Sequence, residues 1–239
     1  MSALRRWSFR PRWVTTAAAL GFCALSIALG NWQLRRAAEK EAVYAERMAR
    51  AQEAPTTLPA EPVDPARWVW RRVVVRGEFV GGRAILLDNR TRDGRAGFEV
   101  VTPLKVGPGA PYVLVNRGWI AAGRTRNELP AVRTPRGPVR IEGLAFVPPA
   151  GVFALGTTDP GQRVWPHLDL ARYREWSGLA IQPIVVLQTS DSQDGLARAW
   201  PAPQSEAAKH SAYALQWYLF ALISIVLYVA LNLKRNRTR

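Results

Sequence analysis

The sequence predicts a membrane protein in which two transmembrane helices, one near each end, flank an extracytoplasmic, mainly-β (α+β) domain. Residues 13–34 and 211–233 contain no charged side chain. A helix of either length spans roughly 33–35 Å, enough for the ~30 Å hydrocarbon core of a bilayer. Between the two runs, short β-branched and aromatic segments are bounded by Gly, Pro or Asn, which is typical of strands. These two observations set the fold class.

The first apolar run has two alternatives to a retained helix, and both are weaker. A cleaved signal peptide has an apolar region of about 7–15 residues, and this run is longer, with no clear A-x-A site before Arg35. A lipoprotein signal needs a small residue before its cysteine, whereas the bulky Phe22 precedes Cys23. We therefore expect two retained membrane helices.

The positive charge is concentrated beside these helices. Of the formal net charge of +15, eight charges lie in residues 1–34 and 211–239, which contain no acidic residue. Basic clusters favour the cytoplasmic side, although Arg35, Arg36, Lys40 and Arg47 follow the first helix. We expect cytoplasmic basic tails at residues 1–12 and 234–239 and a periplasmic body. The first 12 residues are short for a mitochondrial presequence, so a bacterial inner membrane is the simplest location.

The body divides by composition. Residues 35–65 are expected to form a helical extension through Glu53 and then an extended linker with four prolines at 55–65. Residues 66–189 form a β-rich domain, an antiparallel sheet or small barrel with a helical insertion at 169–176, where Asp169 is a candidate cap. Its expected strands are 68–75, 84–88, 98–104, 112–116, 139–147 and 184–187. Residues 190–210 are expected to be a second linker.

Several classes of function are disfavoured by composition. A single Cys23 excludes a disulfide framework and a cysteine zinc site, and two methionines disfavour a copper relay, so we expect no copper or zinc site. His167 and Asp169 are two residues apart and do not face one another on a helix, which favours a structural role. No serine elbow or phosphate loop accompanies them, so we expect no enzyme. Nucleic-acid binding is also not expected, because the charge lies beside the membrane helices.

Four motifs occur in a fixed order along the chain. Residues 29–40 read LGNWQLRRAAEK, residues 97–104 read GFEVVTPL, residues 113–120 read VLVNRGWI, and residues 210–218 read HSAYALQWY. In order, spacing and two-helix topology the chain resembles the Surfeit-locus-one (Surf-one or Shy-one) family of cytochrome c oxidase assembly proteins, from about residue 14 to 233. No single motif is specific, but the four together are.

The resemblance implies a non-enzymatic assembly factor for an aa3-type oxidase. It implies that the protein aids delivery or insertion of haem a into the large subunit, with that subunit and the haem a synthesis machinery as partners. A scaffold that binds assembly intermediates without ligating haem is the alternative. The sequence departs from the family around the histidine, where Ala208, Lys209 and Ser211 replace the usual asparagines and leucine. Hydrogen bonds from those asparagines therefore cannot be carried over.

A haem site is chemically reasonable at the outer ends of the two helices. His210 offers an imidazole for the iron, aromatic rings offer walls, and cations suit the propionates. Helical spacing places His210, Tyr213 and Trp217 on one face, and Trp32, Arg36 and Lys40 on one face of the first helix. Antiparallel packing would join these stripes into a slot open to lipid. The residues expected to hold haem a transiently are His210, Tyr213, Gln216, Trp217, Trp32, Arg36 and Lys40. The alternative is an ordinary interfacial belt of aromatic and basic residues.

The Asn116-Arg117-Gly118-Trp119 motif ends a strong expected strand. One interpretation is structural, with Gly118 supplying backbone freedom and Trp119 packing into the core. The other is a docking surface for the oxidase. The sequence does not choose between them.

Overall fold

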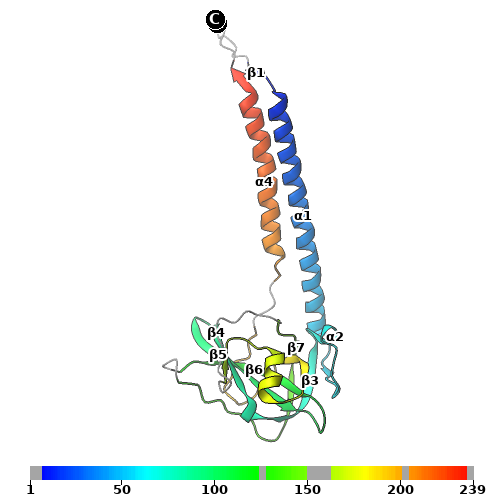
Figure 1. Cartoon of the computed structure of the whole chain (residues 1–239), viewed down its shortest axis with the longest axis vertical. Coiled ribbons are helices and arrows are strands. Elements are labelled where there is room, and N and C mark those ends of the chain that lie inside the picture. The colour runs from blue at the N-terminus through cyan, green and yellow to red at the C-terminus, as the bar shows by residue number, and fades with distance from the viewer. Residues whose placement is uncertain (1–6, 124–127, 150–162, 201–204, 236–239) are drawn as a thin grey trace. The chain divides into compact units, whose positions relative to one another are not determined.

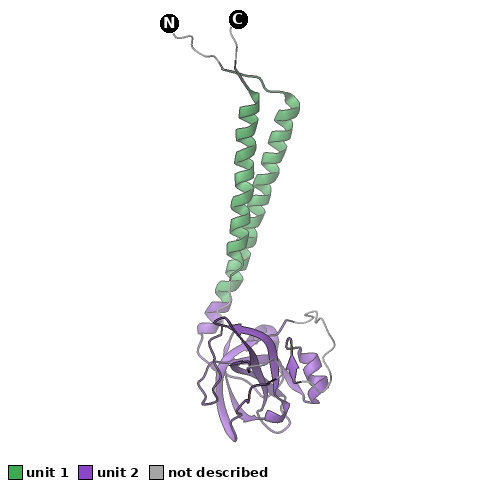
Figure 2. Cartoon of the chain, turned by 90° about the vertical axis from the view of Figure 1, so that its left-hand side faces the viewer, with its two compact units in different colours: residues 1–46, 203–239 green, residues 47–202 purple. Residues whose placement is uncertain are grey.

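The computed structural model describes residues 7–123, 128–149, 163–200 and 205–235. The chain forms two compact units, one of residues 1–46 and 203–239 and the other of residues 47–202 (Figure 2). Parts of the expected basic tails, residues 1–6 and 236–239, lie outside the described residues. So do residues 201–204 of the expected second linker.

The first unit is a pair of helices that run side by side (Figure 1). Helix α1 (Trp13–Gln52) continues without a break past residue 34, which confirms the expected extension. Helix α4 (Ala207–Asn232) begins four residues before the expected start. Both helices are long and apolar enough to cross a membrane, by length and composition. Strands β1 (Trp7–Phe9) and β10 (Leu233–Arg235) pair antiparallel next to the ends of these helices.

Small residues form the seam between α1 and α4. On α4, alanines seven residues apart are buried, and on α1 a serine, a glycine and an alanine are buried. Such residues let two helix backbones approach closely. The buried seam residues are Ser26, Gly30, Ala37, Ala207, Ala214 and Ala221.

The second unit holds the remaining strands and two short helices. The strands are β2 (Thr56–Thr57), β3 (Arg72–Phe79), β4 (Ile85–Arg92), β5 (Arg95–Lys105), β6 (Tyr112–Ala121), β7 (Pro138–Phe146), β8 (Val164–Trp165) and β9 (Ile181–Gln188). The helices are α2 (Pro65–Trp68) and α3 (Leu170–Ser177), and Gly81–Arg83 form a 3-10 turn, η1.

The sheet closes on itself. Its order is β2-β3-β7-β9-β6-β5-β4-β8, and a further pairing of β3 with β5 joins β3, β7, β9, β6 and β5 into a barrel. Of the two expected architectures, the structure therefore has the small barrel, with α3 as the helical insertion. Within the barrel the pairings are antiparallel except that of β6 with β9, and the short strands β2 and β8 also pair parallel, with β3 and β4.

The barrel core follows the two-residue period of its strands. Val113 and Val115 of β6 and Ile184 of β9 belong to one buried cluster, to which all five barrel strands contribute. The intervening Leu114 and Val185 belong to a second cluster, which includes Tyr173 of α3. Both faces of β6 and β9 are thus covered, which explains their nearly continuous apolar sequences.

Helix α2 replaces the start of the strand expected at 68–75. Asp64 accepts a hydrogen bond from the Ala66 N–H, and Pro65 occupies the first turn, so the local sequence starts a short helix. The strand consequently begins at Arg72. At α3 the expectation holds, because the Asp169 side chain accepts a hydrogen bond from the Arg172 N–H.

The two expected linkers pack against the barrel where the structure describes them. Leu58 and Val63, from the proline-rich segment, are buried in the barrel cluster. Buried Gln182 accepts a hydrogen bond from the Val63 N–H and donates one to the Glu61 carbonyl. Asp194 and Leu196 are also buried. The proline-rich segment and the segment after β9 are therefore part of the domain, because they pack against residues far away in the sequence. Composition alone does not reveal such contacts.

Candidate functional site

His210 contacts the first helix through one specific partner. Its Nδ1 lies 2.7 Å from Oε1 of Gln33. An amide oxygen can only accept a hydrogen bond, so this contact suits the neutral tautomer that carries its proton on Nδ1. In that tautomer the lone pair is on Nε2, the nitrogen that can bind a metal.

Polar contacts hold the helices together around this pair. Lys40 lies 3.2 Å from Glu206, and the Ser205 hydroxyl donates to Glu41 at 2.6 Å. The Tyr218 hydroxyl donates to Asn31 Oδ1 at 2.7 Å. The hydrogen bond from Lys40, together with its charge, holds the pKa of Glu206 below its ordinary value. The imidazole thus lies among several polar contacts that join α1 to α4 and to the residues just before it.

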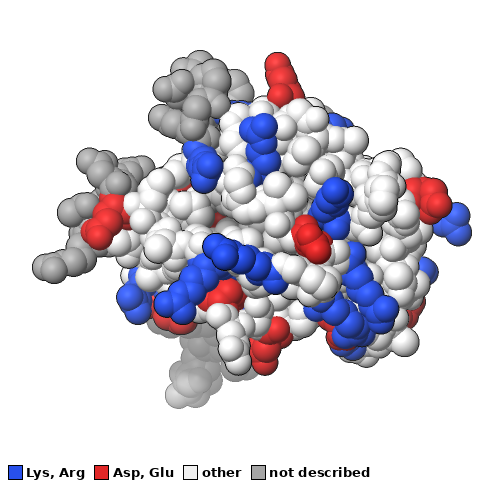
Figure 3. All heavy atoms as spheres, turned by 90° about the horizontal axis from the view of Figure 1, so that it is seen from below, with Lys and Arg blue, Asp and Glu red and all other residues white. Residues whose placement is uncertain are grey.

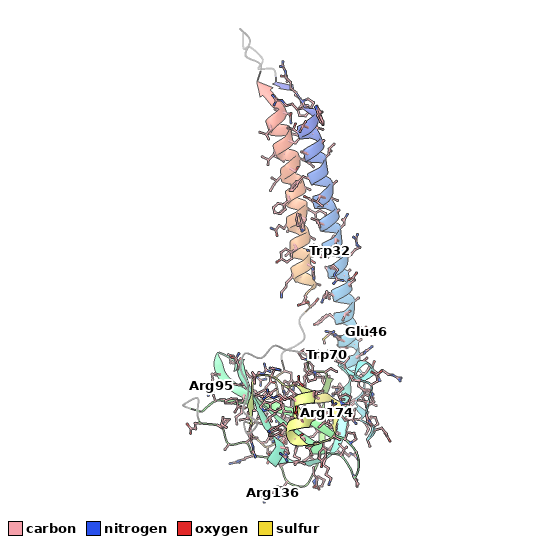
Figure 4. The ribbon with its side chains drawn as sticks, viewed as in Figure 1. Trp32, Glu46, Trp70, Arg95, Arg136 and Arg174 are labelled. Carbon is pink, nitrogen blue, oxygen red and sulfur yellow. The ribbon has the colours of Figure 1, made fainter. Side chains whose placement is uncertain are left out.

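The predicted aromatic residues lie at this end but do not form a slot between the helices. Trp32 is 46% exposed and Tyr213 is 55% exposed. Trp217 is half-buried and contacts Phe220 edge-on, with 5.6 Å between ring centroids. Figure 4 shows Trp32 projecting from α1. The rings therefore line outer surfaces of the helix pair.

Helix geometry explains why Gln33 replaces Trp32 as the partner of His210. Gly30 and Ala37 are buried at the seam, and Gln33 lies three residues after Gly30 and four before Ala37, on the same face. Trp32 is rotated by about 100° from Gln33. Gln33 was not among the predicted site residues, although it stands in the LGNWQ motif. The small residues on either side were the signal that could have identified it.

The predicted cations at this end already have partners. Arg36 forms an exposed ion pair with Glu39 at 2.6 Å, and Lys40 pairs with Glu206. Gln216 is exposed. The structure therefore collects all seven predicted haem residues at one end of the helix pair, on more than one face.

Arg117 is an interior residue of the barrel domain. Its side chain is fully buried, and Nη2 donates to Asp194 at 2.8 Å and to the Arg133 carbonyl at 2.6 Å. Its guanidinium also lies over the Phe79 ring at 4.9 Å. Burial, the largest influence, lowers the pKa of Arg117 despite the Asp194 carboxylate. Arg117 therefore supports the fold rather than a docking surface.

The other residues of this motif also make internal contacts. Asn116 is buried and donates to Glu99 at 2.9 Å, and Gly118 has a φ of 137°. The Trp119 indole N–H donates to the Arg90 carbonyl at 2.7 Å. Trp119 remains half-exposed and lines a depression of about 520 Å³ with Arg90. Of the four residues, Trp119 alone keeps substantial exposure for docking.

The part of the chain that the structure describes shows no cluster of metal-binding side chains. No group of three or more His, Cys, Asp or Glu that could hold a metal ion occurs there. His167 is half-exposed in the segment between β8 and α3. Basic and acidic side chains are interspersed on the face shown in Figure 3.

Comparison with known proteins identifies similar sequences. The model of the SURF1 family matches residues 20–222. A SURF1-like protein of Monosiga brevicollis is 25% identical over 229 residues, which cover 91% of this chain and 87% of that protein. A SURF1-like protein of Drosophila melanogaster is 26% identical, covering 89% of this chain and 75% of its own.

A more distant match has a more informative name. The cytochrome oxidase assembly protein SHY1 of Saccharomyces cerevisiae is 27% identical over 163 residues, covering 64% of this chain and 41% of that protein. The span matched by the family model includes most of the apolar part of α1, the whole barrel domain and the first half of α4. Because that match covers well over half of its length, the chain belongs to the SURF1 family.

Proposed function

We propose that this protein is a membrane-anchored assembly factor for an aa3-type cytochrome c oxidase that aids delivery or insertion of haem a into the large subunit. Membership of the SURF1 family and the name of the yeast relative support the assembly role. The contact between His210 and Gln33 is the observation that carries the haem role. In this proposal the enzyme that makes haem a supplies the cargo, and the protein itself catalyses no reaction.

The proposed location is a bacterial inner membrane. Helices α1 and α4 are the two anchors, and their length and composition fit this role. The basic residues at both chain ends favour cytoplasmic termini, which leaves the barrel domain in the periplasm. Haem a carries a long isoprenoid tail, so a site reached from the bilayer suits this cargo.

Gln33 prepares His210 for a single iron bond. Histidines that bind metals usually donate their other N–H to a carboxylate, carbonyl or water, which fixes the ring orientation and tautomer. Gln33 Oε1 provides that acceptor at 2.7 Å, and the proton on Nδ1 leaves Nε2 for the iron. One replaceable ligand also suits a carrier that must release its cargo.

The surrounding side chains supply the remaining features that haem needs. Tyr213 and Trp217 lie on the His210 face of α4 and offer apolar surface to a macrocycle. Arg36 and Lys40 currently pair with exposed carboxylates. Exposed ion pairs of this kind contribute about 0–1 kcal/mol, so a haem propionate can replace either acid at little cost.

Haem content after co-expression with the haem a synthesis enzymes tests the ligand role. We expect the wild-type protein to purify with haem a, and His210→Ala to lose most of it, as measured by optical spectra and extracted haem. His167→Ala is the matched control, because it removes the other histidine of the chain, and it should keep the wild-type content. Equal haem content in wild type and His210→Ala would remove the ligand role.

The scaffold function remains the second candidate because one observation favours it. The seam between α1 and α4 is closed by small residues, and the rings point outward instead of enclosing a slot. Capture of the large subunit by a protein that contains no haem, with no haem in the captured subunit, would support the scaffold. Loss of the aa3 spectrum on deletion of the gene, with b-type haems intact, is expected for both candidates.

A further inference from the structure

A groove lies between α1 and α4 at the end opposite His210, near β1 and β10. We call it the terminal groove. Its volume is about 740 Å³, and apolar side chains from both helices line most of it, including Phe22, Ile223, Leu227 and Leu231. Arg10 and Arg12 lie at its end. Small-molecule sites usually measure roughly 300–1,000 Å³, so the groove has the size of a ligand site.

The length of the groove matches one leaflet of a bilayer. On one side its lining runs from Arg12, just before α1, to Phe22 on α1. Ten residues of helix rise about 15 Å, which is half of a ~30 Å hydrocarbon core. An extended acyl chain that follows this wall would therefore end near the middle of the membrane.

Contacts near the chain ends border the groove at its polar end. The Arg10 N–H donates to the Asn232 carbonyl at 3.0 Å, and the Phe9 ring meets the Tyr228 ring at 5.9 Å. Tyr228 also hydrogen-bonds Thr16 at 2.7 Å. The backbone at Arg10 is thereby held beside the end of α4.

The charge at this end has no compensating acid. Residues 1–38 and 207–239 contain no Asp or Glu, so neither Arg10 nor Arg12 has a carboxylate on these parts of the chain. Both arginines are exposed. A planar guanidinium suits a phosphate oxygen pair, and basic pockets between membrane helices are suited to anionic lipid headgroups.

We propose that the terminal groove binds one anionic phospholipid, with its phosphate at Arg10 and Arg12 and an acyl chain along Phe22, Ile223 and Leu227. This inference rests on the membrane anchoring proposed above but does not depend on haem. The apolar walls distinguish the ligand from free phosphate, and the uncompensated charge distinguishes it from a zwitterionic lipid. The lipid would also fix which end of the helix pair faces the anionic leaflet.

Native mass spectrometry of the full chain tests the proposal. The protein is purified in a neutral sugar detergent and mixed with equal amounts of dioleoyl phosphatidylglycerol and dioleoyl phosphatidylcholine. We expect retention of phosphatidylglycerol to exceed that of phosphatidylcholine on the order of tenfold. The double variant Arg10→Gln/Arg12→Gln should bind the two lipids equally.

Two further variants separate the contributions of charge and shape. Arg35→Gln/Arg47→Gln removes the same charge from exposed positions on α1 away from the groove and should keep the wild-type preference. Ala18→Phe fills the groove and should reduce retention of both lipids. Resistance to alkaline carbonate extraction checks that each variant is still integrated in membranes.

Three results would overturn the proposal. They are equal retention of both lipids by the wild type, an unchanged preference in Arg10→Gln/Arg12→Gln, and displacement of bound phosphatidylglycerol by millimolar inorganic phosphate. Haem content is measured on the same samples. A wild-type protein that prefers phosphatidylglycerol but contains no haem would count against the proposed function alone. A wild-type protein that contains haem but shows no lipid preference would count against the lipid site alone.

Discussion

Removing the carboxylate of Asp194 should destabilise the barrel domain more than any other single loss of charge described above. Asp194 Oδ2 accepts from Arg117 at 2.8 Å, and both oxygens accept from Arg198 at 2.6 Å. The Leu196 N–H is a further donor, at 3.3 Å. Asp194→Asn would leave the fully buried guanidinium of Arg117 without a counter-charge.

The expected loss is about 3–5 kcal/mol in the free energy of unfolding. That range is typical when one member of a buried ion pair is removed and its partner stays buried without compensation. Since domains of this kind have a total stability of about 5–15 kcal/mol, the variant would be marginally folded. Urea unfolding of the full chain in detergent, monitored by near-ultraviolet circular dichroism, measures the loss.

Two variants test whether the loss comes from the buried, unpaired charge and not from the substitution itself. Asp191 is exposed, and Asp191→Asn should change the stability by about 0.5 kcal/mol or less. Arg117→Met with Asp194→Leu removes both buried charges and should recover much of the loss, because apolar replacements of buried pairs are often tolerated. A loss below about 1 kcal/mol in Asp194→Asn, or an equal loss in Asp191→Asn, would refute the reasoning.

The same carboxylate predicts the direction of the pH dependence. Burial alone raises the pKa of Asp194, but hydrogen bonds from Arg198 and Arg117 outweigh it, so the pKa lies below the ordinary value of 3.8. The unfolded chain therefore binds this proton more readily than the folded chain. The stabilisation that the Asp194 carboxylate gives to the folded domain is complete above its ordinary pKa. It is lost as the pH falls through the pKa of Asp194 in the folded state. The acid-induced loss should be smaller in Asp194→Asn.

Three further substitutions test other contacts. A methyl group added at Gly30 would lie 2.7 Å from the Tyr218 ring, so Gly30→Ala should lower the melting temperature of the helical signal by several degrees, whereas Gly21→Ala, with open space around it, should not. Gly118 has a φ of 137°, and a methyl group added there would lie 2.7 Å from the Ala197 carbonyl oxygen. Gly118→Ala should therefore cost about 1–3 kcal/mol in the free energy of unfolding in urea, whereas Gly107→Ala, with open space around it, should cost little. The Tyr173 hydroxyl donates to the Arg83 carbonyl at 2.6 Å, so Tyr173→Phe should cost about 1–3 kcal/mol in the free energy of unfolding. Burial also raises the pKa of Tyr173, so an ultraviolet titration of this variant should show one fewer tyrosine that resists ionisation at high pH.

Local patterns in the sequence predicted most of the elements. The uncharged runs and the helix-forming residues after them predicted α1 and α4 closely, because helix formation depends on neighbouring residues. Segments rich in β-branched and aromatic residues and bounded by Gly, Pro or Asn predicted six strands, and Asp169 predicted the start of α3. The start of β3 was misplaced, because aromatic residues resembled a strand where Asp64 and Pro65 begin a helix.

Contacts between distant residues could not be predicted from local patterns. The pair of Gln33 and His210 joins residues 177 positions apart, and the pair of Arg117 and Asp194 joins residues 77 positions apart. Helical spacing alone identified Trp32 as the partner face of α1. The identity of the face that meets α4 depends on which small residues pack at the seam. That packing is a property of two helices together.

The closure of the barrel has a mechanical consequence. Strand β3 joins β5 through two residue pairs, Glu78 with Lys105 and Phe79 with Leu104, while seven pairs join β3 to β7. The pairing of β3 with β5 is therefore the weakest closure of the barrel, and local opening of the sheet should begin there. The amide protons hydrogen-bonded between β3 and β5 should consequently exchange with deuterium well before those between β5 and β6. Eight residue pairs join β5 to β6.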